Sequence, residues 1–269
     1  MESRYAASVE AHSIGSSSAA DRPLALVTGV GRREGIGAGI ARELARQGWD
    51  LALSHWTPYD VRVHGAHAHV AAVAVEELRE LGAEVRTIEA DLQNPEAPAR
   101  LLAEAGGRSP VRALVLSHAE SVDSSILDTS VESFDRHVHV NARASWLLVK
   151  AFAEQFPTSL HGLGRIVALT SDHTVHNLPY GASKGALDRI VLAAARELGH
   201  LGISANVVNP GPIDTGWMDE VTRSALTTRQ PGGRLGTPED VAAVVAFLVS
   251  APGGWINGQL IKADGGFSA

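Results

Sequence analysis

The stretch Leu24-Ala-Leu-Val-Thr-Gly-Val-Gly-Arg-Arg-Glu-Gly-Ile-Gly37 joins a short apolar run to a glycine-rich turn. The apolar residues 24–28 predict a buried strand, and the spacing of Ile40 and Leu44 predicts that a helix follows the glycines. Small residues let a pyrophosphate approach the backbone, and the free amides of a helix N-terminus bind its charge. The alternative is an ordinary strand-to-helix turn, but a strand before the glycines and a helix after them favour phosphate binding.

Apolar runs and amphipathic segments continue to alternate along the chain. Strands are expected near residues 24–28, 50–54, 84–89, 111–117, 164–170, 203–208 and 258–263, and helices near 36–47, 67–81, 95–105, 130–156, 180–200 and 238–250. This alternation predicts a parallel sheet with helices on both faces. The expected fold class is therefore α/β, with one doubly wound sheet of about seven strands.

Composition fits one large domain, because 269 residues of which 45% are hydrophobic can bury a sizeable core. We expect a flexible tail over residues 1–22 and a single domain over 23–269. The net charge of −7, without a cluster of Lys or Arg, weighs against nucleic acid and anionic membranes as partners. No apolar stretch reaches the ~20 residues that cross a bilayer, so a cytoplasmic location is expected.

A second motif, Tyr180-Gly-Ala-Ser-Lys184, opens an amphipathic segment after the strand expected at 164–170. Residues four apart are neighbours on a helix, so the Lys184 ammonium is expected to lower the pKa of the Tyr180 hydroxyl. A phenol with a lowered pKa can donate a proton near neutral pH. Alone, the pattern also fits a half-buried ring beside a solvated amine, and the glycine-rich stretch makes catalysis the stronger interpretation.

Together these two stretches resemble the short-chain dehydrogenase/reductase family, and the resemblance runs from about Leu24 to the C-terminus. Further matches follow in the family's order: Asp91-Leu92, Asn141, Ser171, Pro210-Gly-Pro-Ile-Asp-Thr215 and Asp264-Gly-Gly266. The resemblance implies a Rossmann-type fold and hydride transfer between a nicotinamide and a carbonyl or secondary alcohol. Members that reduce 3-oxoacyl thioesters on acyl carrier protein are the most similar, and the substrate would be a small molecule.

The resemblance also implies a role for each matched residue. Tyr180 would give its proton to the carbonyl oxygen, and Ser171 would hydrogen-bond the same oxygen. Lys184 would hold the ribose hydroxyls, and Asn141 would hold the water that returns protons to Lys184. The cofactor-binding residues that it implies are Gly29, Gly31, Arg32, Arg33, Gly35, Ile36, Gly37, His55, Asp91, Leu92, Ala119, Tyr180, Lys184, Pro210, Gly211, Ile213 and Thr215.

Three stretches depart from the family pattern. The loop Val30 to Glu34 is longer than usual, as it is in enoyl reductases of the same superfamily, but those enzymes space Tyr and Lys further apart. Ser117-His-Ala-Glu120 replaces Asn-Asn-Ala-Gly, and Ser171 stands closer to Tyr180 than usual. A dinucleotide-binding sensor or scaffold without catalysis is therefore kept as an alternative. An epimerase or dehydratase is the weaker one, since residues after Ala251 are too few for a substrate domain.

The residues after the second expected strand bear on the cofactor. Asp50-Leu-Ala-Leu-Ser54 is followed by His55 and Trp56, so this strand does not end in the acidic residue that repels a 2′-phosphate. Arg32 and Arg33 stand in the glycine-rich loop, and a guanidinium pairs well with phosphate. NADP(H) is therefore favoured over NAD(H), the alternative being that both arginines are solvated loop charges.

The remaining expectations concern assembly, metals and substrate. The helices near 130–156 and 180–200 carry apolar residues on several faces, which predicts a homodimer or homotetramer. His64, His67 and His69 have a spacing that can bind zinc, but their polar setting favours solvated side chains, and no metal is expected. The segment 212–236 is expected to form a substrate lid.

Overall fold

The computed structural model describes residues 22–269 except 66–70, 108 and 217. Seven parallel strands form one sheet in the order β3-β2-β1-β4-β5-β6-β7. The strands are β1 (Leu24–Thr28), β2 (Asp50–His55), β3 (Val85–Glu89), β4 (Val111–Leu116), β5 (Gly164–Leu169), β6 (Ile203–Asn209) and β7 (Leu260–Lys262). This confirms the predicted doubly wound α/β sheet, in which strand order reverses between β1 and β4.

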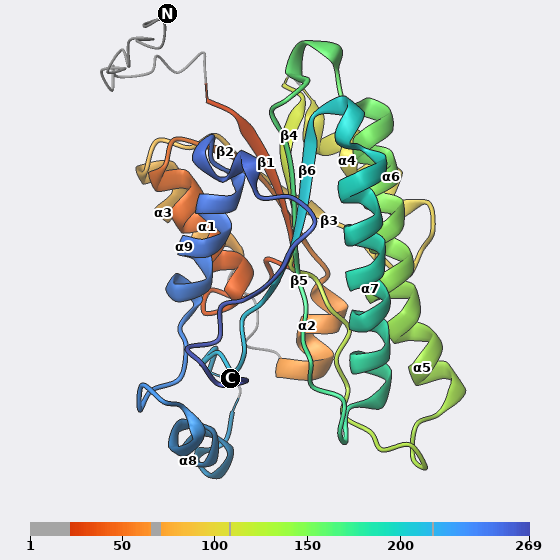
Figure 1. Cartoon of the computed structure of the whole chain (residues 1–269), viewed down its shortest axis with the longest axis vertical. Coiled ribbons are helices and arrows are strands. Elements are labelled where there is room, and N and C mark those ends of the chain that lie inside the picture. The colour runs from red at the N-terminus through yellow and green to blue at the C-terminus, as the bar shows by residue number, and fades with distance from the viewer. Residues whose placement is uncertain (1–21, 66–70, 108, 217) are drawn as a thin grey trace, which may run out of the picture.

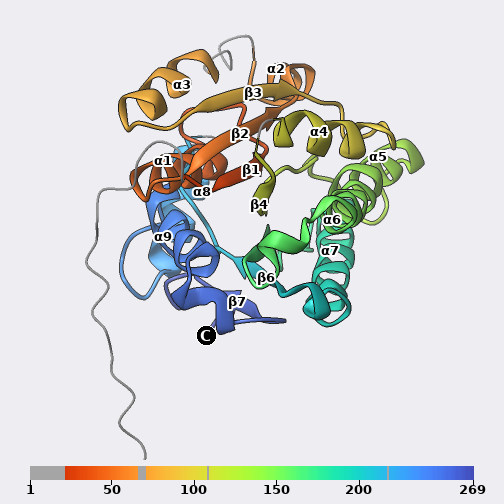
Figure 2. The ribbon, with the colours of Figure 1, turned by 90° about the horizontal axis from the view of Figure 1, so that it is seen from above.

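Helices cover both faces of the sheet (Figures 1 and 2). One layer holds α1 (Ile36–Arg46), α3 (Ala71–Glu80) and α9 (Pro238–Val249). The other holds α4 (Ala97–Gly106), α5 (Val131–His137), α6 (Ala144–Gln155) and α7 (Leu178–Glu197). Short helices α2 (Thr57–His64) and α8 (Glu220–Arg229) lie toward the end of the sheet where α7 begins (Figure 1).

The continuous apolar runs of the strands explain these two layers, because a strand buried on both faces needs apolar residues at every position. In β1, Leu26 belongs to the same core cluster as Leu148 of α6, on one face of the sheet. Its neighbour Val27 belongs to the cluster that contains Ile40 and Leu44 of α1, on the other face. All five side chains are fully buried. The protein therefore has two hydrophobic cores, one on each face of the sheet.

The expected elements match the structure apart from two helices and one turn. Helices α2 and α8 were not expected, and α8 lies within the segment predicted to be a lid. The helix expected at 130–156 is continuous, but its middle turn, Val138–Arg143, is a π-helix. The predicted tail falls outside the described residues except Arg22, whose Nε donates to Asp50 Oδ1 at 3.0 Å. Among the described residues, no helix has the length and apolar character needed to cross a membrane.

Candidate functional site

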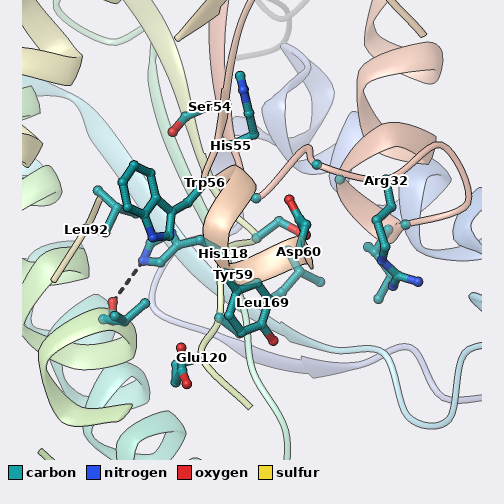
Figure 3. A pocket seen from close by; sticks show the side chains of 18 of the residues that line it. Arg32, Ser54, His55, Trp56, Tyr59, Asp60, Leu92, His118, Glu120 and Leu169 are labelled. Carbon is teal, nitrogen blue, oxygen red and sulfur yellow. Dashed lines mark hydrogen bonds between the residues drawn. The ribbon is translucent and has the colours of Figure 1, made fainter. Parts of the chain in front are cut away.

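A cavity of about 420 Å³ lies at the carboxyl ends of the parallel strands, where ligands bind in open α/β sheets. The glycine-rich loop, α2, the loop after β4 and the start of α7 form its walls (Figure 3). Residues predicted for the site that line it are Gly29, Gly31, Arg32, Gly35, Ile36, Gly37, His55, Asp91, Leu92, Ala119, Tyr180, Lys184, Pro210 and Thr215. Motifs scattered along the sequence therefore meet in one pocket.

The glycine-rich loop has the features of a phosphate cradle. Gly29 has φ +75°, and a Cβ there would lie 2.6 Å from the Cα of His118, so only glycine fits. A Cβ at Gly37 would lie 2.9 Å from the carbonyl oxygen of Gly29. Gly35, directly before α1, has no side chain to cap the helix, and the first turn of α1 holds no acid. The first amides of α1 can therefore bind an anion, and this loop fits the pyrophosphate of a dinucleotide.

The two arginines of this loop have different environments. Arg32 lines the pocket, and its Nη1 donates to the carbonyl oxygen of Thr215 at 3.2 Å. Arg33 is exposed outside the pocket lining, with its guanidinium 3.9 Å from Glu77. The structure therefore keeps Arg32 as a cofactor-binding candidate and removes Arg33 from contact with the pocket.

Two residues of the predicted nicotinamide-gripping segment lie behind the pocket wall. Ile213 is 5% exposed and belongs to the core on the α1 side of the sheet. Gly211 has φ +65° and packs so closely on Asp264 that a Cβ would lie 2.5 Å from the Cβ of Asp264. Both therefore position their neighbours Pro210 and Thr215, which do line the pocket.

Helix α7 places the phenol and the ammonium of the second motif at one end of the pocket. Lys184 is 2% exposed, and its Nζ donates to the carbonyl oxygen of Leu169 at 2.8 Å. The same Nζ lies 5.6 Å from the centroid of the Tyr180 ring. Burial lowers the pKa of Lys184 to about 8, and the nearby Asp188 carboxylate opposes that shift.

The electrostatics of Tyr180 differ from the expectation. Burial, followed by the proximity of Tyr59, raises the pKa of Tyr180, and only a hydrogen bond with Ser171 lowers it. The prediction that the pKa of this phenol is lowered is wrong, because burial has the largest effect on it and raises it. The phenol is consequently protonated at neutral pH, which is the state that donates a proton.

Ser171 reaches the phenol although the loop before α7 is short. The chain turns through His176, which has φ +59°, before α7 begins at Leu178. That left-handed residue lets the short loop close, and Ser171 lies near enough to Tyr180 to lower the pKa of its phenol.

We expect Ser171→Ala to lower kcat by about 10- to 1000-fold, because the role predicted for Ser171 is to donate to the oxygen on which charge develops. Thr174→Ala in the same exposed loop is the control, since Thr174 packs against Gly181 instead. Steady-state rates of the two variants decide the assignment. A loss confined to Thr174→Ala would show that another hydroxyl does this work.

Asn141, predicted to hold a catalytic water, has its side chain committed to the protein. Its Oδ1 accepts from the amide of Glu120 at 2.7 Å, and its Nδ2 donates to the carbonyl oxygen of Glu120 at 2.9 Å. Nδ2 also donates to Ser183 Oγ at 2.8 Å. Because both amide hydrogens are used, the side chain fastens the loop after β4 to α7, beside Lys184.

The residue that replaced the family's glycine, Glu120, has an evident partner. It is 4% exposed, and Arg62 Nη2 lies 2.7 Å from both of its carboxylate oxygens. Arg136 lies 3.9 Å away. Sequence reasoning missed this pairing because Arg62 belongs to α2, whose presence was not expected. The carboxylate that stands in place of the family's glycine is therefore one side of a contact with α2.

His118 is a second buried group that the sequence did not single out. Its Nε2 lies 3.1 Å from the carbonyl oxygen of Val140, which can only accept, so Nε2 carries the proton. Its Nδ1 then accepts from the Thr28 hydroxyl at 2.7 Å. Burial, and after it Lys184, lowers the pKa of His118 to about 3. This imidazole is therefore neutral and ties the loop after β4 to β1.

The histidines between β2 and α3 have a spacing that can bind zinc, but they were predicted to be solvated. His67 and His69 lie outside the described residues, and nothing is stated of the His64 side chain. Within the part of the chain that the structure describes, no three His, Cys, Asp or Glu side chains are grouped as metal ligands.

Comparison with known proteins agrees with this geometry. A family model described as Enoyl-(Acyl carrier protein) reductase matches residues 29–268. An uncharacterized oxidoreductase of Bacillus subtilis, YjdA, is 32% identical over 249 residues, covering 91% of this chain and 96% of that protein. Versicolorin reductase 1 of Aspergillus parasiticus is 35% identical over 269 residues, with 91% and 96% covered.

A solved structure shows the same arrangement of the chain. A short-chain dehydrogenase from Burkholderia cenocepacia, in complex with NADP, superposes with a TM-score of 0.81 at 32% identity. The match covers 92% of this chain and 98% of that one. With its sheet order, its glycine-rich loop and its Tyr-Lys helix, this chain belongs to the short-chain dehydrogenase/reductase family and is an NAD(P)-dependent oxidoreductase.

Proposed function

We propose that this protein interconverts a carbonyl and a secondary alcohol by hydride transfer, with NADP(H) as the favoured cofactor. One observation carries the proposal: Tyr180 and the buried Lys184 line the pocket end where α7 begins, and Ser171 lies close enough to Tyr180 to lower the pKa of its phenol. Each of these groups has a use in carbonyl reduction. A sensor or scaffold has no need of their combination.

Each group has a separate role in the proposed reaction. A bound nicotinamide supplies or accepts the hydride, and the protein supplies alignment and charge. In the direction of reduction, the Tyr180 hydroxyl gives its proton to the carbonyl oxygen. Ser171 donates a hydrogen bond to the same oxygen as negative charge develops on it. Lys184, with a pKa of about 8, is charged at neutral pH and can hold the ribose hydroxyls.

Substrate choice follows from the spacing of the catalytic pair. Tyr180 and Lys184 occupy consecutive turns of α7, which favours carbonyl reduction over reduction of an enoyl group. We propose 3-oxoacyl thioesters as the first substrates to test, with aldehydes and cyclic ketones beside them. The experiment follows the absorbance of the reduced nicotinamide with each substrate and with NADPH or NADH. Absence of oxidation across the whole panel, with intact nucleotide binding, would contradict catalysis and favour the sensor.

The arginine pair allows a matched test of the cofactor. We expect Arg32→Ala to raise the KM for NADPH by about 10- to 100-fold, the effect of losing a charge-assisted hydrogen bond to phosphate. Arg33→Ala removes the same charge one position later, outside the pocket lining, and should change this KM by less than about 2-fold. Steady-state kinetics with NADPH and NADH measures both. An equal effect of the two variants, or a wild type that prefers NADH, would contradict the assignment of Arg32.

The proposed enzyme is a cytoplasmic homodimer or homotetramer. Support for assembly comes from apolar side chains on the outer surface of α5 and α6. Val131, Phe134 and Trp146 are 70%, 38% and 49% exposed. Apolar side chains grouped on a helix surface favour contact with a second subunit.

A further inference from the structure

Helix α2 brings a carboxylate to the glycine-rich loop. Asp60 lies over Gly31 so closely that a Cβ on that glycine would overlap its carboxylate. Asp60, Gly31 and Arg32 all line the pocket, and Figure 3 shows Asp60 between α2 and the loop that carries Arg32. A side chain at position 31 would displace this carboxylate from its place over the loop.

Asp60 is held in an electropositive corner. Burial raises the pKa of its carboxyl group, while Arg32 and His55 act against that shift. His55 is the last residue of β2, and Arg32 follows Gly31 in the loop. Arg32 and His55 therefore both lie close enough to act electrostatically on the Asp60 carboxylate.

Rigid contacts keep α2 in this place. At its start, the amide of Thr57 donates to Glu89 Oε1 at 3.2 Å. In the first turn, the Tyr59 hydroxyl also interacts with the backbone of Ser121. Near the end of the helix, Arg62 binds the buried Glu120. Asp60 lies between these attachments, so its carboxylate is not a freely moving surface charge.

The position of Asp60 corresponds to the adenosine ribose. In a doubly wound sheet the ribose lies at the end of the second strand, beside the glycine-rich turn, where an acid accepts from the 2′-hydroxyl and an arginine binds a 2′-phosphate. Strand β2 ends in Ser54-His55 and has no such acid. The acid at this place comes from α2 instead.

We propose that Asp60 competes with the 2′-phosphate of NADP(H) for Arg32, so that α2 sets the balance between NADP(H) and NAD(H). This rests on the proposed use of a nicotinamide dinucleotide. Arg32 favours the phosphate and Asp60 opposes it, because a phosphate placed beside a carboxylate meets like-charge repulsion. The carboxylate is instead suited to accept from the ribose hydroxyls of NAD(H).

The test compares two nucleotides that differ only in the 2′-phosphate. Adenosine 2′,5′-bisphosphate and adenosine 5′-monophosphate are titrated by calorimetry into wild type and Asp60→Asn. We expect the variant to bind the bisphosphate about 10-fold more tightly, and the monophosphate within about 2-fold of wild type. Glu34→Gln removes one negative charge from the glycine-rich loop but outside the pocket lining, and it should leave both affinities unchanged.

A double-variant cycle shows whether the effect passes through Arg32. In an Arg32→Ala background, Asp60→Asn should no longer improve bisphosphate binding, because the guanidinium for which the carboxylate and the 2′-phosphate compete is then absent. An unchanged preference in Asp60→Asn, or a gain that persists without Arg32, would overturn the proposal. Wild-type protein that binds neither nucleotide would instead contradict the proposed function itself, so the two failures are distinguishable.

Discussion

Tyr180→Phe should lower kcat by about 10²- to 10⁴-fold, the range expected when a general acid is removed. The change deletes one oxygen and keeps the ring that packs beside Lys184. Nucleotide affinity should stay near the wild-type value, because the glycine-rich loop and the pocket residues Asp91 and Leu92 are untouched. Single-turnover reduction of a carbonyl substrate, with nucleotide binding by calorimetry, measures the two quantities separately.

Tyr59→Phe is the matched control for this variant. Tyr59 is a second phenol lining the same pocket, close enough to raise the pKa of Tyr180 electrostatically. Its hydroxyl is hydrogen-bonded to the backbone of Ser121, where it anchors α2. We expect its removal to change kcat by less than about 10-fold, since the loss of an ordinary hydrogen bond to the backbone has a modest effect. Wild-type turnover in Tyr180→Phe, or equal losses in both variants, would contradict the role of Tyr180 and the catalytic proposal built on it.

The fold could be predicted because its signals are local. The apolar run of β1 and the glycines that follow it encode strand, turn and helix within one short stretch. Gly29 illustrates the physical basis, since its positive φ and its contact with His118 both exclude a side chain. Repetition of strand and helix then leaves few topologies for a parallel sheet.

The parts of the site that could not be predicted are contacts between distant elements. Helix α2 is short and its amphipathic pattern is weak, so its stability derives from Glu89, Glu120 and Ser121, which lie elsewhere in the sequence. From the sequence, Glu120 was only a departure from the family pattern, because nothing indicated that Arg62 is its partner. Tertiary contacts of this kind override local propensity. They also place Asp60 of α2 near the end of β2, a position that the sequence did not indicate.

The predicted pKa of Tyr180 was wrong for a related reason. Spacing alone placed Lys184 beside Tyr180, and α7 confirms that they are neighbours. The pKa of each group, however, depends first on burial, which a helical repeat does not report. The carbonyl oxygen of Leu169, which accepts the hydrogen bond from the Lys184 Nζ, is a backbone atom without any sequence signature.

Asn141→Ala should reduce the free energy of unfolding by about 2–4 kcal/mol, the cost of leaving buried polar groups without partners. The side chain is fully buried and makes three hydrogen bonds, two of them to the backbone of Glu120 and one to Ser183. Its loss frees the loop after β4, which carries Ala119 in the pocket wall. Denaturant unfolding measures the stability, and calorimetry measures nucleotide binding.

The control is Asn206→Ala, a buried amide remote from the pocket lining. Asn206 Nδ2 donates to the carbonyl oxygen of Ile256 at 2.7 Å, and its Oδ1 accepts from the amide of Gln259 at 3.1 Å. Both variants should lose similar stability, because each leaves backbone groups without their side-chain partner. Only Asn141→Ala should also weaken dinucleotide binding, by about 10-fold or more, since a pocket wall must then be ordered on binding. Equal nucleotide affinity in the two variants would mean that Asn141 stabilises the fold without shaping the site.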